Sequence, residues 1–554
     1  MVLALIGGCD NPRLNPADSG GQPQDAATQV DSAPPPDANV PYKPMCATPK
    51  DQPTLLSNAE YNLTVRDLLG DHTAPANGFI WGDNHDELGR LVFGDQLTIQ
   101  GRMDQYGKAA DTLAHAALAR LDTLLPCDPV AMGEDACAMR FITAFGKRAY
   151  RRPLTADNQA RLKDAYGLGR RNGTFETGIE AVIAAALKSP HFLEVEIDAT
   201  PGRTPLLDGY EMASRLSYFI YHSMPDAELF AAADAGQLTT VAGVVAQAQR
   251  MLQDKKAVDG LNAEVSRWLS LDRLEQQASQ AATAAADAAL YRDMGRETLR
   301  FVQSNFFNKS PVRDLLRSTK TWVNGPLAAI YDLGGITGPD FQPATWDPGM
   351  RSGLLTQASL LTLTSNPPVT FPTLRGTFVI NRLLCMVIPP PPNSGLLINI
   401  DPVPGESKRQ TYARTFTAQP GCQPCHRLTD PIGFALESFD SAGRFRATDN
   451  GAAIDPSGVL IFDGLMGAFN GPADLADKIA GSSLFTDCVA QQWIAAALHR
   501  TWSPETDENR CISEDIIRNW QGYPLMDLIE TIVRDPSFRT ARGCSYACPR
   551  SNAI

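Results

Sequence analysis

The sequence predicts a mainly α, multi-domain protein. Apolar residues recur at spacings of three and four in many segments, as in amphipathic helices, whereas alternating runs typical of strands are scarce. The chain has 554 residues, of which 43% are hydrophobic and 20% are charged. This composition is that of a globular protein, and the length exceeds what one hydrophobic core organises. We therefore expect several helical domains.

The first expected helix begins after Ser57, whose spacing from Glu60 is that of a capping box, and it ends at Gly70. Pro153 is expected to turn the chain between two later helices, because proline interrupts helical hydrogen bonding. Further segments with helical periodicity are 102–125, 139–150, 156–168, 175–188, 209–221, 241–253, 259–269, 354–363, 473–479, 485–499, 514–520 and 524–533. The four prolines at 389–392 predict an extended stretch that leads to the following segment, or a surface linker.

The N-terminal stretch points to export. Residues 1–9 resemble the truncated end of an apolar export segment, and Ile6-Gly7-Gly8-Cys9 resembles a bacterial lipobox with Cys9 as the acylated residue. A basic stretch does not precede it, so either translation starts upstream of Met1 or the run is accidental. Residues 10–45 are rich in Pro, Asp, Ala, Ser and Gln, which predicts a disordered, flexible tether. Any membrane attachment is expected through a lipid on Cys9, in the periplasm or at the outer surface of the cell envelope.

The net charge is unfavourable for a nucleic-acid partner. The formal charge is -13 and the isoelectric point is about 5.1. Binding to phosphates needs clustered lysine and arginine, and the longest basic run is 148–152. We therefore expect no nucleic-acid binding.

Cys422, Cys425 and His426 form a Cys-x-x-Cys-His motif. Two thiols at this spacing can add across the vinyl groups of one porphyrin, and the adjacent imidazole can bind the iron. The motif therefore predicts one covalently attached haem c with His426 as a metal ligand. The alternative is a disulfide or half of a zinc site, with His426 incidental.

Residues next to the motif could complete a haem site. We expect the second ring nitrogen of His426 to donate to a backbone carbonyl in a turn at 428–431, stiffened by Pro431. Apolar side chains that could cover the porphyrin, or belong to an ordinary core, are Ile432, Phe434, Leu436 and Phe439. Cations available for the two propionates, each of which could also be a plain surface charge, are Arg427, Arg444 and Arg446.

Glu437 and Asp440 are three residues apart, which could place both carboxylates on one helical face. Acid–base chemistry is one interpretation, and local capping or pairing with the arginines is the favoured one. No catalytic residue is assigned.

The second axial ligand of the iron is open. Met466 is the first candidate because it follows the motif in a glycine-rich stretch, and a packed core methionine is the alternative. His499 is the second candidate, followed by Met350, Met386, another side chain or an open position. His72, His85, His115, His191 and His222 lack metal-ligand spacing and are expected to be structural or exposed.

Eleven cysteines suit an oxidising envelope compartment. Without Cys9, Cys422 and Cys425, eight remain, which permits four disulfides or several buried thiols. Proximity suggests pairing of Cys127 with Cys137 and of Cys488 with Cys511, although sequence does not choose among the possible connectivities.

Five stretches of the chain resemble the planctomycete-type cytochrome family, which comprises exported bacterial proteins built from adjoining domains of unknown function. They are LSNAEYNLTVRDLLG (56–70), FGKRAYRRPLT (145–155), YEMASRLSYFIYHSMPDAEL (210–229), RSGLLTQASLLTLTSNP (351–367) followed by Arg375 and Gly376, and CQPCHRLTDPIGFALESFDSAGRFR (422–446). The resemblance implies a haem-bearing domain in a helical envelope protein. It departs at His499, where relatives more often carry glycine, and this histidine is expected to approach the haem or to be exposed.

The expected domains are helical domains at 46–130, 131–200 and 201–335, a haem-binding domain at 345–450 and a C-terminal helical domain at 451–545. We expect an exported mono-haem c-type cytochrome that exchanges electrons with a redox partner protein or a small molecule. One alternative is a haem-dependent, peroxidase-like oxidoreductase with an open distal position. The other is a haem-free, disulfide-bonded surface binding or scaffold protein.

Overall fold

The computed structural model describes residues 45–46, 54–79, 99–171, 173–195, 206–280, 285–388, 403–418, 420–499, 507–520, 522–541 and 544–545. The expected export segment with Cys9, the expected tether up to residue 44, His85 and the proline run at 389–392 lie outside these ranges. In the described part the protein is mainly α, as the sequence predicts. No helix in these ranges combines the length and apolar content needed to cross a bilayer.

The first part of the chain is a group of helices that pack on one another. Ser57 and Glu60 form the expected capping box, and Gly70 ends the first helix in the left-handed conformation. The elements are β2 (Thr54–Leu55), α1 (Asn58–Leu69), η1 (Pro75–Gly78), α2 (Ile99–Ala117), η2 (Leu118–Arg120), α3 (Leu121–Leu124), α4 (Pro129–Met132), α5 (Glu134–Ala149), α6 (Ala156–Arg170), α7 (Phe175–Leu187), α8 (Pro190–Leu193) and β3 (Glu194–Val195).

The middle part is also helical and contains one short ladder between β4 and β5. Its elements are α9 (Gly209–Tyr221), α10 (Ala227–Asp234), η3 (Gln237–Thr239), α11 (Val241–Met251), α12 (Lys256–Leu269), α13 (Asp272–Gln280), α14 (Ala285–Phe307), α15 (Asp314–Arg317), β4 (Lys320–Val323), α16 (Gly325–Ile330), β5 (Gln342–Thr345), η4 (Leu354–Thr356) and α17 (Ala358–Leu363). The expected helix at 354–363 is thus divided into η4 and α17, and α13 and α14 were not expected from the periodicity.

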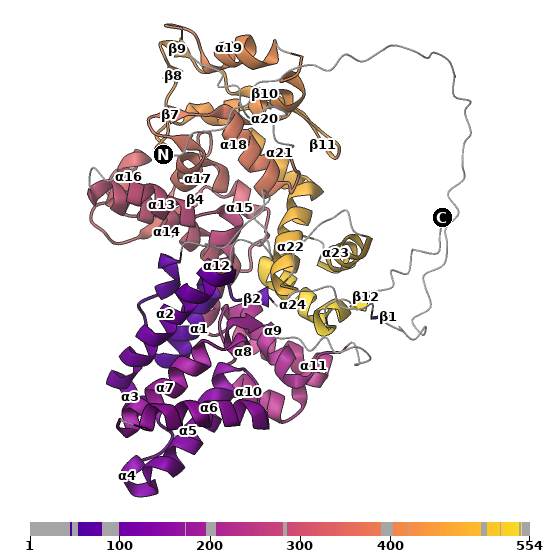
Figure 1. Ribbon diagram of the computed structural model, residues 1–554. Helices are drawn as coiled ribbons and strands as arrows, with labels where there is room; N and C mark the ends of the chain where they lie inside the picture. Colours follow the sequence, from indigo (N-terminus) through magenta and orange to yellow (C-terminus); the bar gives the residue numbers. More distant parts are fainter. Residues whose placement is uncertain are drawn as a thin grey trace, which may run out of the picture.

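The motif lies in a part that mixes short helices with hairpins. Its elements are β6 (Ser365–Asn366), β7 (Val369–Thr370), α18 (Pro372–Phe378), the π-helical η5 (Val379–Leu383), α19 (Lys408–Tyr412), the π-helical η6 (Ala413–Thr417), α20 (Gln423–Ala435), η7 (Leu436–Ser438), β8 (Thr448–Asp449), β9 (Ala452–Ala453), β10 (Ser457–Phe462) and β11 (Leu465–Asn470). Figure 1 shows α19, α20 and the hairpins at one end of an elongated molecule, with α4 to α6 at the other end.

The last part of the chain contacts segments from much earlier in the sequence. Its elements are α21 (Pro472–Gly481), α22 (Ser483–Ala497), α23 (Asp507–Trp520), α24 (Leu525–Arg534), η8 (Pro536–Arg539) and β12 (Cys544–Ser545), which pairs with β1 (Met45–Cys46). Helix α22 packs on α9 and runs from the motif end toward the N-terminal helices in Figure 1. The C-terminal helices therefore connect the part that holds the motif with α9 and α11.

Two hydrophobic cores organise the molecule. One gathers apolar side chains from Leu56 to Val195 and is completed by Tyr218, Met224 and Phe230. The other extends from Leu207 to Ala541 and includes much of the motif region. Stretches expected as separate domains therefore share cores, and the expected domain boundaries stay a prediction.

One disulfide was expected correctly and one was not. Cys127 and Cys137 are bridged, with Cα atoms 5.7 Å apart. Cys488 pairs with Cys385 and not with Cys511, so that prediction is wrong. The fold brings α22 beside the end of η5, which places the Cα atoms of Cys385 and Cys488 5.1 Å apart despite 103 residues of separation. Cys511 is also disulfide-bonded.

The stretch at 457–470 is a β-hairpin, and the glycine-rich stretch that contains Met466 forms its turn and the start of β11. β10 and β11 pair in register from Ser457 with Asn470 to Phe462 with Leu465. The turn is Asp463-Gly464, and Gly464 has a φ of 76°. Asp-Gly between alternating apolar residues is a strong hairpin signal, so this element was predictable.

Candidate functional site

The motif occupies the first turn of α20. Cys422 is the residue before the helix, Pro424 stands in its first turn, and the amide of His426 donates to the carbonyl of Cys422 at 3.2 Å. Proline is favoured there because its missing N–H lies among those that a helix start leaves unbonded. Cys422 is buried and Cys425 is partly exposed, and both carry thiols and not a disulfide bridge. The helix thus places two thiols and one imidazole within a single turn.

His426 is held by the side chain of Asp430. Its Nδ1 lies 2.9 Å from Oδ2 of Asp430, and the side chains are 12% and 4% exposed. A carboxylate oxygen accepts, so Nδ1 donates and Nε2 is left for another partner. No hydrogen bond from the described residues reaches Nε2. The expectation of a backbone carbonyl acceptor is wrong, because residues 428–431 continue α20 and Pro431 lies inside the helix.

Two hydroxyl groups fix the carboxylate in turn. Thr373 of α18 donates through Oγ1 to Oδ1 of Asp430 at 2.7 Å, and Thr429 donates to the same oxygen at 3.1 Å. Oγ1 of Thr373 also lies 3.4 Å from Nδ1 of His426. The orientation of the His426 ring is therefore set by neighbours from two helices.

Close contact between α18 and α20 makes this arrangement possible. A Cβ on Gly376 would lie 1.9 Å from the carbonyl oxygen of Thr429, and one on Gly433 would lie 1.9 Å from that of Pro372. Only glycine permits backbones to approach this closely. The two glycines therefore bring Thr373 within reach of Asp430.

An aromatic cluster covers the motif on one side. The rings of Phe416 and His426 stack with centroids 4.2 Å apart and an angle of 7° between their planes. Tyr412 packs edge-on against Phe416 and Phe434, and Cys422 belongs to the same buried cluster. Phe416 lies in the π-helical turn η6, a kind of irregularity that is frequent at functional sites. Tyr412 and Phe416 were not singled out in the sequence, although their i, i+4 spacing just before the motif was a usable signal.

Only one of the four expected covering residues joins this cluster. Phe434 packs beside Cys422, whereas Ile432, Leu436 and Phe439 belong to the larger core. Successive residues of a helix point in different directions, so α20 shows one face to the motif side and another to the core.

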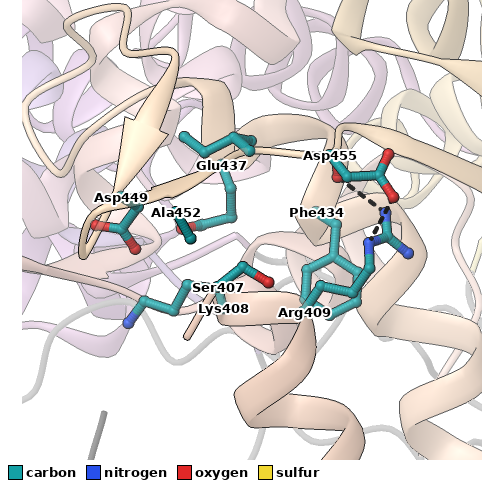
Figure 2. Close-up of a pocket in the computed structure, with 9 residues that line it drawn as sticks. Ser407, Lys408, Arg409, Phe434, Glu437, Asp449, Ala452 and Asp455 are labelled. Carbon is teal, nitrogen blue, oxygen red and sulfur yellow. Dashed lines mark hydrogen bonds and ion pairs between the residues drawn. The ribbon is translucent and has the colours of Figure 1, made fainter. Parts of the chain in front are cut away.

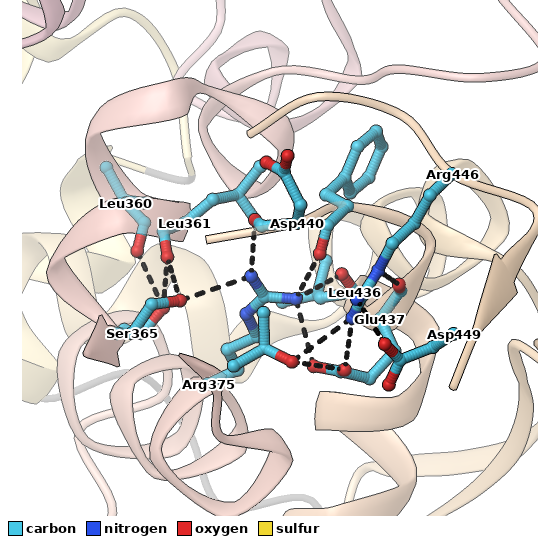
Figure 3. A network of polar contacts seen from close by, with 12 residues as sticks. Leu360, Leu361, Ser365, Arg375, Leu436, Glu437, Asp440, Arg446 and Asp449 are labelled. Atoms are coloured by element: carbon cyan, nitrogen blue, oxygen red, sulfur yellow. Dashed lines mark hydrogen bonds and ion pairs between the residues drawn. The ribbon is translucent and has the colours of Figure 1, made fainter. Parts of the chain in front are cut away.

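Glu437 and Asp440 have structural roles, as favoured from the sequence. Glu437 accepts from the buried Arg375 at 3.0 Å and from Arg446 at 2.8 Å, and Asp440 caps the turn by accepting from the amides of Ala442 and Arg444. Arg375 also donates to the carbonyls of residues 436, 439 and 440 (Figure 3). Burial lowers the pKa of Arg375, and the charge of Glu437 opposes this effect. Arg375 as the centre of this network was missed, since nothing in sequence distinguishes a buried arginine from an exposed one.

The two arginines expected at haem propionates differ in their surroundings. Arg446 is engaged by Glu437 and by Asp449, whose Oδ1 lies 2.7 Å from Nη1. Arg444 is 56% exposed and lies 3.9 Å from Asp440. Arg444 is therefore the less constrained of the two.

A small pocket of about 280 Å³ lies beside the aromatic cluster. Phe434 and Arg409 line one side and Asp449 lines another (Figure 2). The guanidinium of Arg409 stacks on Phe434 at 4.5 Å and pairs with Asp455 at 3.2 Å. Phe434 thus connects the pocket with the cluster around Cys422.

The candidates for a second axial ligand lie in different places. Met466 is on the solvent face of the hairpin and is 75% exposed, opposite Leu465 and Phe469, which face the core. His499 is buried, and its Nε2 lies 3.1 Å from Oε1 of Glu60 in α1. The expectation that His499 approaches a haem or is exposed is therefore wrong. Met386 is partly buried against the larger core, and Met350 lies in the turn before η4.

The histidines outside the motif have ordinary surroundings. His115 pairs with Glu180 on the surface, His191 packs on Tyr150, His222 is buried and His72 is exposed. No group of three or more His, Cys, Asp and Glu side chains in the described ranges is placed to hold a metal ion.

Four families match adjoining parts of the chain. They are PSD3, a protein of unknown function (DUF1587), at 55–119, PSD5 (DUF1595) at 137–193, PSD4 (DUF1592) at 207–333 and PSCyt3 (DUF1588) at 351–449, the last three also described as proteins of unknown function. The PSCyt3 range contains the motif, Asp430 and Arg375. Neither a curated protein nor a solved structure matches the chain. The matched ranges follow one another from residue 55 to residue 449, and the chain therefore belongs to the planctomycete cytochrome-type family in which these domains adjoin.

Proposed function

We propose that this protein is an exported mono-haem c-type cytochrome that transfers electrons in the cell envelope. Cys422 and Cys425 form the thioethers to the haem, and His426 is its axial ligand. The observation that carries the proposal is the state of His426. Its Nδ1 is held by Asp430, while Nε2 makes no hydrogen bond to any described residue.

The chemistry of the donor groups fits a haem. The porphyrin supplies four nitrogens to its iron, so this chain needs to supply only an imidazole and two attachment thiols. Both thiols lie at the start of α20, and Tyr412, Phe416 and Phe434 offer apolar surface beside them. When bound, the haem would supply one-electron chemistry. We propose Arg444 as a propionate partner, since it is exposed and only loosely paired.

A second candidate function is a haem-dependent oxidoreductase with an open distal position. The place of Met466 favours it, because this side chain points to solvent from the hairpin. Carbon monoxide or cyanide would then bind the purified protein without displacing a side chain. Met466→Leu separates the two functions: it leaves the spectrum unchanged if the position is open, and it abolishes a methionine-ligated spectrum if Met466 is the ligand.

The test of haem attachment is chemical. The chain that follows Cys9 is exported in a host with cytochrome c maturation proteins, denatured, extracted with acidified acetone and examined as an alkaline pyridine haemochrome. We expect haem that resists extraction in the wild type and is lost in Cys422→Ala/Cys425→Ala. The matched control is Cys127→Ala/Cys137→Ala, which removes a cysteine pair in another part of the fold and should retain the haem. A colourless wild type would overturn the proposal and favour a haem-free envelope scaffold.

We also propose that Cys9 carries the lipid that anchors the protein to the envelope, and that the partner is a redox protein or a small electron donor or acceptor. Expression of the full chain with labelled palmitate tests the anchor. Label that is absent from Cys9→Ser and present in the wild type supports it, and a wild type without label contradicts it.

A further inference from the structure

Asp430 is a buried carboxylate with an unusual set of partners. Its side chain is 4% exposed, and within the described ranges its one ion-pair partner is His426. The other carboxylate at this end of the fold, Glu437, is paired with both Arg375 and Arg446. A buried carboxylate normally needs a cationic partner, because leaving water is costly for a charged group. The charge of Asp430 is therefore directed at the imidazole of His426.

The two carboxylate oxygens of Asp430 have different partners. Oδ2 of Asp430 accepts from Nδ1 of His426 at 2.9 Å, whereas Oδ1 accepts from Thr373 and Thr429. The two hydroxyl groups hold the carboxylate so that only one oxygen faces the ring. Histidines that bind metals commonly donate their second N–H to a carboxylate, which makes the imidazole a stronger donor to the metal.

We propose that Asp430 is a positioning residue that makes His426 a strongly electron-donating axial ligand and lowers the reduction potential of the bound haem iron. This inference rests on the proposed function. A negative charge near the iron stabilises the ferric state more than the ferrous state, and burial strengthens the interaction because few water molecules screen it. Hydrogen bonding and charge around an axial ligand are among the means by which a protein tunes a haem.

The consequence concerns the direction of electron flow. A haem whose ferric state is stabilised gives up its electron readily. Removing the charge of Asp430 would therefore make the haem a weaker reductant toward the same partner.

The experiment measures midpoint potentials of the intact holoprotein by spectroelectrochemistry. Asp430→Asn keeps the size of the side chain and an oxygen that can accept from Nδ1, but it removes the charge. We expect the ferric-to-ferrous equilibrium to shift toward the ferrous form by tenfold or more, which is about 59 mV upward for a one-electron couple. The matched control is Asp157→Asn, which makes the same charge change in α6, at the other end of the molecule (Figure 1). Charges so far apart are screened by salt, so this control should leave the potential nearly unchanged.

A second variant predicts the opposite sign. Thr373→Val removes the hydroxyl that draws negative charge toward Oδ1 of Asp430, so the carboxylate acts more strongly on His426 and the potential should fall. This variant also carries the test if Asp430→Asn does not incorporate haem.

Each outcome decides one point. A wild type without covalent haem overturns the proposed function. A wild type with covalent haem overturns only this inference if Asp430→Asn moves the potential no more than Asp157→Asn does, or if Thr373→Val leaves it unchanged or raises it. A rise in Asp430→Asn together with a fall in Thr373→Val supports it.

Discussion

Two histidine–carboxylate pairs lie in different parts of this molecule, and they use the same interaction differently. His499 and Glu60 join α1 to the end of α22 across 439 residues of sequence, with 3.1 Å between Nε2 and Oε1. His426 and Asp430 lie four residues apart in α20, with 2.9 Å between Nδ1 and Oδ2. The first pair uses Nε2 to connect two parts of the fold. The second uses Nδ1 and leaves Nε2 without a hydrogen bond to any described residue, and Nε2 is the atom that we propose as the axial ligand.

The surroundings of the His499–Glu60 pair indicate that it stabilises the fold. Glu60 is also part of the capping box of α1, and Tyr218 packs edge-on against His499. His499 has a φ of 46°, a left-handed conformation that glycine adopts without strain and other residues rarely adopt. The junction pair is thus kept at a cost in backbone strain, which indicates a contribution to stability.

The largest expected effect is at the junction. Glu60→Gln removes the negative charge from a buried pair that joins two parts of the fold and should lower the free energy of unfolding by about 3–5 kcal/mol, measured by urea denaturation near pH 5.5. Glu180→Gln is the matched control, because Glu180 lies 3.1 Å from His115, whose side chain is 79% exposed. Pairs in water contribute about 0–1 kcal/mol, so this control should change stability little. Equal losses in both variants would contradict a special role for the junction.

Acid should weaken the same contact. Burial alone would raise the pKa of Glu60, but the hydrogen bond and charge of His499, aided by His222, lower it to about 2. Since the folded-state pKa lies below the ordinary value of 4.5, the stabilisation is complete above pH 4.5 and is lost as the pH falls from about 4.5 to 2. The loss should approach about 3 kcal/mol. It is measured as the difference in unfolding free energy between wild type and Glu60→Gln, and a difference that stays constant over this interval would refute the prediction.

Two substitutions at His499 distinguish the contribution of its backbone conformation to stability from that of its side chain. His499→Ala and His499→Gly both remove the contact with Glu60, but glycine accepts the left-handed backbone that alanine does not. We expect the glycine variant to be more stable than the alanine variant by about 1–2 kcal/mol in thermal or urea unfolding. Lys163→Ala and Lys163→Gly serve as the reference, because Lys163 is an exposed residue inside α6, where glycine should be the less stable of the two. Equal stabilities of the two His499 variants would show that the backbone relaxes.

How well the sequence predicts a contact depends on how far apart its two residues lie along the chain. The helical class, the Ser57–Glu60 capping box and the Cys127–Cys137 bridge follow from residues close in sequence. Asp430 stands four residues after His426 and could have been identified from helical spacing, had the helix been expected to continue through Pro431. The β10–β11 hairpin could also have been predicted from Asp463-Gly464.

Other contacts depend on the tertiary fold. Sequence does not indicate that His499 meets Glu60, that Cys385 meets Cys488, or that Arg375 is buried with Glu437. Each joins segments that only the packing of helices brings together. The motif itself was recognised because its spacing is local, whereas its surroundings come from α18, α19 and α20 together.

The smallest expected effect is at the motif and tests whether the two pairs truly differ. In the haem-free background Cys422→Ala/Cys425→Ala, the change Asp430→Asn should lower the unfolding free energy by only about 1 kcal/mol, because the pair joins residues of one helix and His426 is partly exposed. Urea denaturation checks this beside Glu60→Gln in the same background. A loss as large as that of Glu60→Gln would mean that Asp430 holds the fold together as the junction does. A small loss combined with a changed haem potential would show that its carboxylate is retained for the ligand that His426 binds.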